Sequence, residues 1–294
     1  MPTFKQLALI GSTASGKSAL AIAYAKKHNC NILSLDSLAL YKEIDIVSAK
    51  PTTQERANVK HFGIDLIYPN ESFDVTLFMQ TYQDAKEKSI NEGKGLIIVG
   101  GSSFYLKILL EGITPLPPIS QETLEITRAT LKEGHAILSN IDPHYMQKIK
   151  PSDRYRIEKM LNLYYETNLP PSEYFKQHPP QPSIEEPLPI YEISVDKEIL
   201  RERIRQRTHR MIQKGLIDEV FYLEKTYTRA PNCMKAIGIR ETLDYFDGIY
   251  TKTELIEKII INTARLAKRQ RTFNRSQFEQ TTTGTLEELQ KRLL

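Results

Sequence analysis

The sequence predicts an α/β protein, with a parallel, doubly wound sheet into which an all-helical domain is inserted. Two observations carry this prediction. Short apolar segments typical of buried strands alternate with segments of helical periodicity, and this alternation is typical of parallel sheets. A stretch bounded by proline clusters is helix-like and contains no clear strand, which favours a separate helical unit. We therefore predict a core domain of residues 1–118 and 188–294, with an inserted helical domain at 119–187.

The first half of the core is predicted to alternate between strands and helices. Its strands are apolar runs bounded by turn residues, and its helices carry apolar residues at helical spacing. Strands that are separated by helices run in the same direction, so a parallel sheet is expected. In chain order the elements are a strand at Gln6–Ile10, a helix at Ala19–Lys27, a strand at Asn31–Asp36, a helix at Phe78–Asn91 and a strand at Gly95–Val99.

After the insert, the core is predicted to resume with one strand and two helices. Ile190–Val195 is strand-like, and Asp196 is placed to cap the helix that follows. A long helix is predicted at Glu254–Arg271. The apolar faces of these two helices are formed by Leu200, Ile204 and Met211 and by Leu255, Ile259 and Ala267.

Composition excludes several classes of protein. The chain has 294 residues, of which 40% are hydrophobic and 26% charged, as in globular proteins. Its longest apolar runs, such as Leu96–Val99, are too short to cross a bilayer, and no signal-peptide pattern follows Met1, so we expect a cytoplasmic protein without membrane contact. Cys30 and Cys233 lie far apart, and no zinc-ligand spacing occurs. The net charge of +4 permits a polyanionic partner without requiring one.

A phosphate-binding loop is predicted at Gly11–Ser18. Its sequence, GSTASGKS, matches G-x-x-x-x-G-K-[ST] between a predicted strand and a predicted helix, so the core is a P-loop fold. The loop amides and the positive helix end hold phosphates, Lys17 adds a charge, and Ser18 can ligate Mg²⁺. We expect a di- or triphosphate ligand with Mg²⁺. The residues expected to bind it are Gly11, Thr13, Ala14, Ser15, Gly16, Lys17 and Ser18.

Asp36 is the candidate catalytic base. It stands at the end of the second predicted strand, and strand ends beside the phosphate loop line the ligand crevice of open α/β sheets. The strand at Gly95–Val99 runs into glycines and not into an acidic residue, which disfavours a nucleotide-hydrolysing motor or switch. The alternative is that Asp36, followed by Ser37, only caps a helix.

Several segments of the chain, which follow one another in the same order as in the family, resemble the tRNA dimethylallyltransferases of bacterial type, also called tRNA isopentenyltransferases. The resemblance rests on the phosphate loop, on DSLALYKEIDIVSAKP at Asp36–Pro51 and on GGSSFY at Gly100–Tyr105. It extends from about Leu7 to Arg275, and ordered blocks are far more specific than a lone phosphate loop. Further similar blocks are Asp153–Leu161, Arg203–Val220, Ala236–Gly238 and Arg265–Gln270.

The resemblance implies transfer of a dimethylallyl group from dimethylallyl diphosphate to the exocyclic amine of the adenosine 3′ to the tRNA anticodon, releasing diphosphate. Asp36 would accept the N–H of this amine, a poor nucleophile because its lone pair is delocalised. Ser102 keeps the hydroxyl that the family uses near the acceptor. Arg207, Lys17 and Mg²⁺ held by Ser18 would neutralise the leaving diphosphate. The expected partners are the anticodon stem-loop and the donor, and we expect a monomer.

Basic residues are candidate contacts for the RNA backbone. Five arginines lie between Arg201 and Arg210, and no acidic residue occurs from Ile259 to Gln277. The alternative for any one of them is a solvated helix face. Tyr41 and Tyr105 are expected either to wall the isoprenoid or the base, or to belong to the core. The residues expected to touch tRNA are Asp36, Ser37, Leu38, Ala39, Ser102, Arg154, Arg156, Lys159, Arg240, Arg265, Lys268 and Arg269.

Other functions stay open from the residues alone. One is an ATP-dependent kinase of a small metabolite, in which Asp36 would deprotonate a hydroxyl. Another is a non-catalytic RNA-binding ATPase, which would not need Asp36. The chain also departs from the family pattern, which often has Gln, Thr-Gly, Arg, Tyr and Trp-Phe at the positions concerned. These positions are Ala39, Ser102-Ser103, Leu124, Ile239 and Phe273-Asn274.

Overall fold

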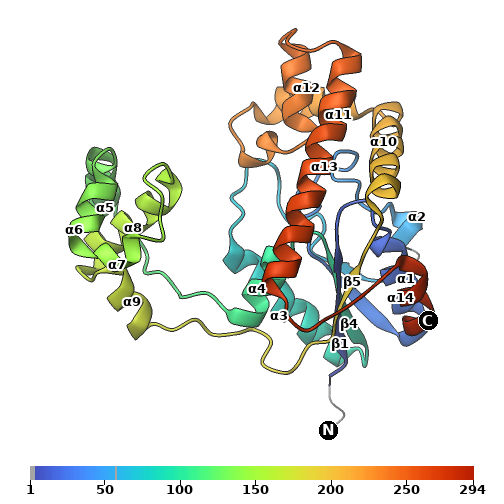
Figure 1. Ribbon diagram of the computed structural model, residues 1–294, viewed down its shortest axis with the longest axis horizontal. Helices are drawn as coiled ribbons and strands as arrows, with labels where there is room; N and C mark the ends of the chain where they lie inside the picture. Colours follow the sequence, from blue (N-terminus) through green and yellow to red (C-terminus); the bar gives the residue numbers. More distant parts are fainter. Residues whose placement is uncertain (1–3, 57) are drawn as a thin grey trace. The chain divides into compact units, whose positions relative to one another are not determined.

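The computed structural model of the protein describes residues 4–56 and 58–294 (Figure 1). Contacts within the chain divide it into two compact units. The core unit combines the chain up to Lys107 with Ile184–Leu294, and the insert unit is Ile108–Ser183. The insert that the sequence predicts, 119–187, shares residues 119–183 with this second unit, which begins earlier, inside a helix.

One six-stranded sheet forms the centre of the core unit, in the order β3-β2-β4-β1-β5-β6. Every neighbouring pair is parallel, which confirms the predicted parallel α/β fold. The prediction missed β3, which has two residues, and β6, whose sequence TTTG has no apolar run. The strands are β1 (Gln6–Gly11), β2 (Cys30–Ser34), β3 (His61–Phe62), β4 (Gly95–Gly100), β5 (Ile190–Ile193) and β6 (Thr281–Gly284).

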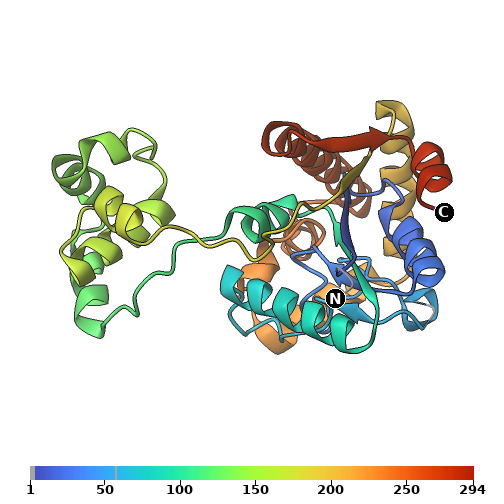
Figure 2. The same ribbon diagram turned by 90° about the horizontal axis from the view of Figure 1, so that it is seen from below.

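Helices cover both faces of this sheet (Figure 2). Successive side chains of a strand point to opposite faces. Leu7 and Leu9 of β1 therefore pack in one cluster with residues of α1 and α14, while Ala8 and Ile10, which are equally buried, face the other side. The helices around the sheet are α1 (Lys17–His28), α2 (Thr53–Arg56), α3 (Val75–Asn91), α4 (Ser103–Glu111) and α14 (Leu286–Leu293).

A second group of helices stands beyond the carboxyl ends of the strands (Figure 1). Asp196 caps the first of them as predicted, because its side chain accepts the N–H groups of Glu198 and Ile199. The six apolar residues predicted to form the buried faces of two of these helices are all buried. The group consists of α10 (Lys197–Gln213), α11 (Leu216–Tyr227), the 3₁₀ helix η1 (Asn232–Lys235), α12 (Ile239–Phe246) and α13 (Lys252–Gln277).

The insert unit is helical and has its own apolar core, built around Leu138, Leu161 and Leu163. Its chain enters and leaves at adjacent points, since the N–H of Ser183 donates to the carbonyl of Leu109 at 2.9 Å and Ile113 forms an antiparallel bridge with Gln181. Its further helices are α5 (Gln121–Thr130), α6 (Gly134–Ile141), α7 (Pro143–Met146), α8 (Arg154–Thr167) and α9 (Pro171–Gln177).

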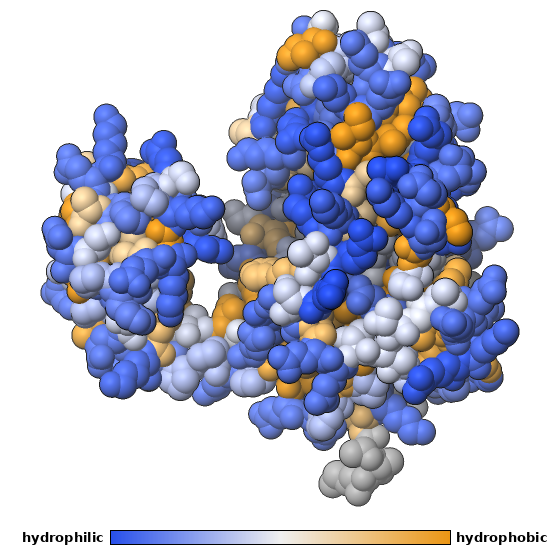
Figure 3. Space-filling model, in the orientation of Figure 1, coloured by the Kyte–Doolittle hydropathy of each residue, from blue (hydrophilic) through white to orange (hydrophobic). Residues whose placement is uncertain are grey.

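The surface in view is mainly hydrophilic, with separate hydrophobic areas (Figure 3). Among the described residues, no helix has the length and apolar character needed to cross a membrane. Phe221, Ile249 and Ile261 are among the large apolar side chains exposed on the core unit.

Candidate active site

The candidate site lies at the carboxyl edge of the sheet, where β2, β4 and β1 are neighbours. The phosphate loop follows β1, Ser102 follows β4, and Asp36 lies two residues beyond β2. Because these strands are parallel and adjacent, the three segments meet at one edge. With residues of α10 and α13 they line a cavity of about 980 Å³. This volume is at the upper end of the range of about 300–1,000 Å³ that ligand sites occupy.

The phosphate loop is held by bonds to its own backbone and to α13. Gly16 has a φ of +97°, which side chains other than that of glycine rarely adopt, and α1 begins at the next residue. The ammonium of Lys17 donates to the carbonyl of Ser12 at 2.6 Å. The N–H of Thr13 donates to Oε1 of Gln270 at 2.9 Å. The loop residues that line the cavity are Thr13, Ala14, Ser15, Gly16, Lys17 and Ser18.

Gly11, which was predicted from the sequence to bind phosphate, does not line this cavity. It is the last residue of β1 and pairs with Ile193 of β5. A Cβ atom at this position would lie 2.9 Å from the carbonyl oxygen of Ile193, so the close approach of the two strands requires glycine.

Asp36 caps a turn where the alternative from the sequence expected a helix, since the next helix, α2, begins only at Thr53. Its Oδ1 accepts the N–H of Leu38 at 2.8 Å and that of Ala39 at 3.2 Å, so the side chain caps the turn that follows β2. Asp36 also lines the cavity. No described residue donates a hydrogen bond to its Oδ2. One carboxylate oxygen therefore fixes the turn, and the other is available as a proton acceptor.

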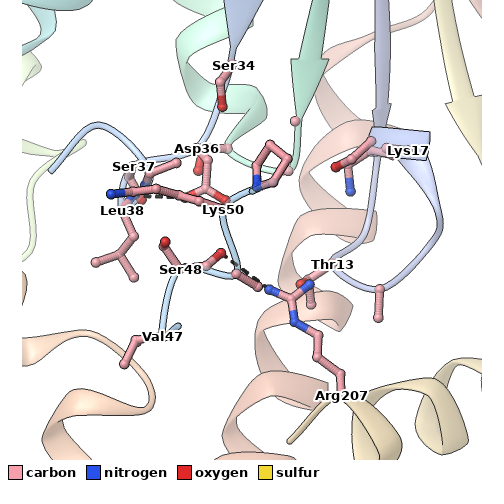
Figure 4. A pocket seen from close by; sticks show the side chains of 18 of the residues that line it. Thr13, Lys17, Ser34, Asp36, Ser37, Leu38, Val47, Ser48, Lys50 and Arg207 are labelled. Carbon is pink, nitrogen blue, oxygen red and sulfur yellow. Dashed lines mark hydrogen bonds between the residues drawn. The ribbon is translucent and has the colours of Figure 1, made fainter. Parts of the chain in front are cut away.

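Two cations, the buried Lys17 and the partly buried Arg207, accompany Asp36 in the cavity. Figure 4 shows Asp36 and Lys17 on opposite sides, with the guanidinium of Arg207 reaching from α10 toward the space between them. Burial, and then the positive charge of Arg207, lower the pKa of Lys17 to about 7, against a smaller opposite effect of Asp36. Burial also lowers the pKa of Arg207. Two desolvated cations facing one cavity favour an anionic ligand.

Arg207 and Arg203 lie on the face of α10 that is turned toward the site, and both line the cavity. Arg207 donates to the carbonyl of Ser48 at 3.5 Å, and Arg203 to that of Ser15 at 3.4 Å. In contrast, Arg201 pairs with a glutamate of its own helix. The arginine run is therefore divided between the cavity and a solvated face.

The segment between Asp36 and Pro51 forms a large part of the cavity wall. This segment is held together by Lys50, whose side chain is buried and which was not singled out from the sequence. The Lys50 ammonium donates to the carbonyl of Tyr41 at 2.6 Å, to Asp45 at 2.7 Å and to Asp65 at 2.6 Å. Its only signal in the sequence was its place in the stretch that carries the family resemblance.

The remaining wall is largely apolar and aromatic. Tyr41 and Tyr105 both line the cavity, and Tyr41 also belongs to the buried core, while their contact with an isoprenoid or a base stays a prediction. Tyr105 stacks on Phe78 with 4.8 Å between the ring centroids, and burial raises its pKa to about 12, which keeps the phenol neutral. Ser37, Leu38, Ala39 and Ser102 line the cavity as well.

Other basic residues predicted to contact RNA lie outside this cavity. Four of them, Arg240, Arg265, Lys268 and Arg269, belong to the core unit on α12 and α13. Arg240 pairs with Glu241 at 2.8 Å. Three more are in the insert unit: Arg154, Arg156 and Lys159 are exposed in the first turns of α8, beside Tyr155, whose side chain is 71% exposed.

Ser18 is suited to hold Mg²⁺ together with a phosphate ligand. It is exposed at the start of α1 and lines the cavity. The described part of the chain contains no group of three or more His, Cys, Asp or Glu residues arranged to hold a metal. Mg²⁺ commonly takes one or two protein oxygens and completes its shell with phosphates and water, so a single hydroxyl beside a phosphate loop fits this ion.

Most of the chain matches one known protein family. A family model described as "IPP transferase" matches residues 39–277, which is more than half of the chain. The chain belongs to the IPP transferase family. The resemblance stated from the sequence is thus confirmed.

Relatives of this IPP transferase cover nearly its whole length. A "tRNA dimethylallyltransferase" of Sulfurovum sp. (strain NBC37-1) is 58% identical, over 99% of this chain and 97% of the relative. One of Nautilia profundicola is 53% identical, over 98% of each.

Solved structures of similar transferases share the fold. The full-length tRNA isopentenylpyrophosphate transferase of Bacillus halodurans has a TM-score of 0.72 at 27% identity, over 98% of this chain and 94% of that one. A eukaryotic dimethylallyltransferase acting on tRNA has a TM-score of 0.84 at 25% identity, over 97% and 75%. This IPP transferase therefore resembles those proteins across both of its units.

Proposed function

We propose that this IPP transferase moves a dimethylallyl group from dimethylallyl diphosphate to the exocyclic amine of the adenosine 3′ to the tRNA anticodon, releasing diphosphate. One observation carries the proposal: a phosphate loop and the Asp36 carboxylate line opposite sides of one cavity. The names of the relatives favour prenyl transfer to tRNA over the kinase considered from the sequence.

The diphosphate half of the donor is assigned to the cationic side of the cavity. The loop amides and Lys17 hold the phosphates, and Arg207 neutralises the charge that develops as the bond between the allylic carbon and the diphosphate oxygen breaks. Mg²⁺ held by Ser18 would supply further positive charge to the leaving group. Apolar side chains of the opposite wall suit the isoprenoid, which carries no hydrogen-bonding group.

The adenosine is assigned to the side of Asp36. As the bond between the amine nitrogen and the allylic carbon forms, the nitrogen loses a proton, which the free oxygen of Asp36 accepts. The Ser102 hydroxyl lies at the same wall and suits a hydrogen bond to the base. The base must leave its stack to enter a cavity of this kind. Ser37, Leu38 and Ala39 are proposed to touch it.

A transfer assay tests the proposed function. The protein is mixed with unmodified tRNA and labelled dimethylallyl diphosphate, and in parallel with labelled ATP and tRNA. We expect label in tRNA only with the dimethylallyl donor. Hydrolysis of ATP without transfer of the allyl group to tRNA would contradict the proposal.

Removing the insert unit is expected to weaken tRNA binding while donor binding persists. The chain enters and leaves this unit at adjacent points, so a short Gly-Ser linker in place of residues 114–180 leaves the strands of the sheet intact. Filter binding across a salt series measures the effect. The slope of log K against log salt should become shallower by about 0.7–0.9 for each RNA phosphate that the protein no longer binds.

A matched variant of the full chain separates charge from the rest of the insert. Arg154, Arg156 and Lys159 are changed together to alanine, and a slope change close to that of the deletion is expected if these side chains bind the phosphates. An unchanged affinity in both variants would assign the RNA to the core unit and its basic residues on α12 and α13.

Diphosphate binding is expected to take up a proton above neutral pH. The pKa of Lys17 is about 7 without a bound anion, and the negative charges of a diphosphate raise it. At about pH 8 the lysine is mostly neutral before binding and charged afterwards, whereas at about pH 6 it is charged in both states. Affinity should therefore fall as the pH rises through 7.

Titration calorimetry in buffers of different ionisation enthalpy measures the proton uptake with inorganic diphosphate. In Lys17→Ala the uptake that belongs to the ligand's own ionisation remains, and the additional uptake at about pH 8 is expected to disappear. Equal uptake in both proteins would show that another group titrates.

A further inference from the structure

Glu219, in the first turn of α11, holds three consecutive backbone amides of the segment that walls the cavity. Its Oε2 accepts the N–H groups of Asp45 at 2.9 Å and Ile46 at 2.7 Å, and its Oε1 accepts that of Val47 at 2.9 Å. No other described residue bonds to this carboxylate. These are charge-assisted bonds, the stronger class of hydrogen bond.

The segment held in this way is not stabilised by the regular backbone hydrogen bonds of a helix or a strand. It lies outside the helices and strands of the described chain, and Glu43 and Ala49 have positive φ values of 64° and 49°. Ile44 and Val47 anchor it in the apolar cluster that includes residues of α11. The Glu219 carboxylate therefore fixes the backbone between these two apolar anchors.

Val47, the last residue whose amide Glu219 holds, and the residues just after it form part of the cavity wall. Val47, Ser48 and Lys50 line it, and the carbonyl of Ser48 accepts a hydrogen bond from the Arg207 guanidinium at 3.5 Å (Figure 4). Glu219 does not line the cavity itself. The chain of contacts thus runs from its carboxylate through one peptide to the guanidinium assigned to the leaving diphosphate.

We propose that Glu219 is a positioning residue, which sets the backbone of residues 45–48 so that Ser48 and Arg207 are placed for the diphosphate. The inference rests on the proposed function for its effect on transfer, but not for its effect on diphosphate binding. The direction in which diphosphate affinity changes distinguishes this role from a simple effect of charge. Removing a negative charge near an anion site by itself strengthens anion binding, whereas loss of positioning weakens it.

The experiment compares three variants of the full chain with the wild type. Glu219→Ala removes both acceptor oxygens, and Glu219→Gln keeps one. Asp218→Asn is the matched control, since this neighbouring acid is exposed and bonds to none of the three amides. Hydrogen exchange of peptides covering residues 44–51, affinity for inorganic diphosphate, and kcat and KM of transfer are measured for each.

In Glu219→Ala we expect faster exchange at residues 45–47, weaker diphosphate binding and a kcat about 10- to 100-fold lower, with little change in the KM for tRNA. Glu219→Gln is expected to lie between this variant and the wild type, and Asp218→Asn to match the wild type. If Glu219→Ala does not fold, the same comparison is made with Glu219→Gln.

Three outcomes would overturn the proposal: exchange at residues 44–51 that stays at the wild-type rate, tighter binding of diphosphate, or a lower melting temperature with unchanged kcat and affinity. If the wild type itself transfers no dimethylallyl group, the proposed function fails. Exchange and diphosphate affinity then still decide whether Glu219 positions the site.

Discussion

Changing Asp36 to asparagine is expected to lower turnover by about 10²- to 10⁴-fold, with little change in tRNA binding. The Oδ1 of Asp36 caps the turn after β2 by accepting two N–H groups. An asparagine can keep these two bonds through its amide oxygen, but it cannot take the proton of the adenosine amine. Single-turnover transfer rates and tRNA affinity are the measurements.

Asp36→Ala completes the comparison, since it removes the cap as well as the base. An intramolecular hydrogen bond contributes about 0.5–1.5 kcal/mol to stability, so this variant, which loses two, should also unfold at a lower temperature. Turnover close to the wild type in Asp36→Asn, together with a large loss in Asp36→Ala, would assign the residue to the turn alone. The base would then have to be sought elsewhere in the cavity.

Changing Lys17 to alanine is expected to weaken binding of dimethylallyl diphosphate and to slow transfer by about 10²- to 10³-fold. The lysine is buried in the phosphate loop and lines the cavity, so its charge acts where the leaving group becomes most negative. Equilibrium binding of the donor and single-turnover transfer measure the two effects. Affinity for tRNA should stay close to that of the wild type.

Lys26→Ala provides the control, because this lysine is exposed near the end of the same helix. It should bind the donor and transfer at wild-type rates. A Lys17→Ala protein in which tRNA binding suffers and donor binding does not would contradict the assignment of the loop to the diphosphate.

Local patterns were enough to predict a parallel sheet with four of its six strands and the position of the phosphate loop and Asp36 at one edge of it. The phosphate loop has a complete motif between a strand and a helix, and Asp36 follows an apolar strand, so both could be placed at the carboxyl edge of a parallel sheet from the sequence. The hydrogen bonding of Asp36 remained open. It depends on the path of the turn, which spacing does not reveal.

Contacts over long sequence separations could not be predicted. The carboxylate of Glu219 meets Val47 across 172 residues, and Gln270 meets Thr13 across 257. Such pairs depend on how α11 and α13 pack beyond the strands. Arg207 was singled out only through the family resemblance, because five arginines in one run look alike until the packing of the helix shows which of them face the cavity.

The order of the strands also sets an order of folding during synthesis. β1 lies between β4 and β5, and β5 is encoded only after the whole insert unit. One edge of β1 therefore stays unpaired while the ribosome makes the insert, for a time on the order of ten seconds at usual rates of elongation. The insert can close on itself in that interval, since its chain ends meet. The phosphate loop follows β1, and its partner in α13, Gln270, is made only after the insert. The surroundings of the loop are therefore completed last.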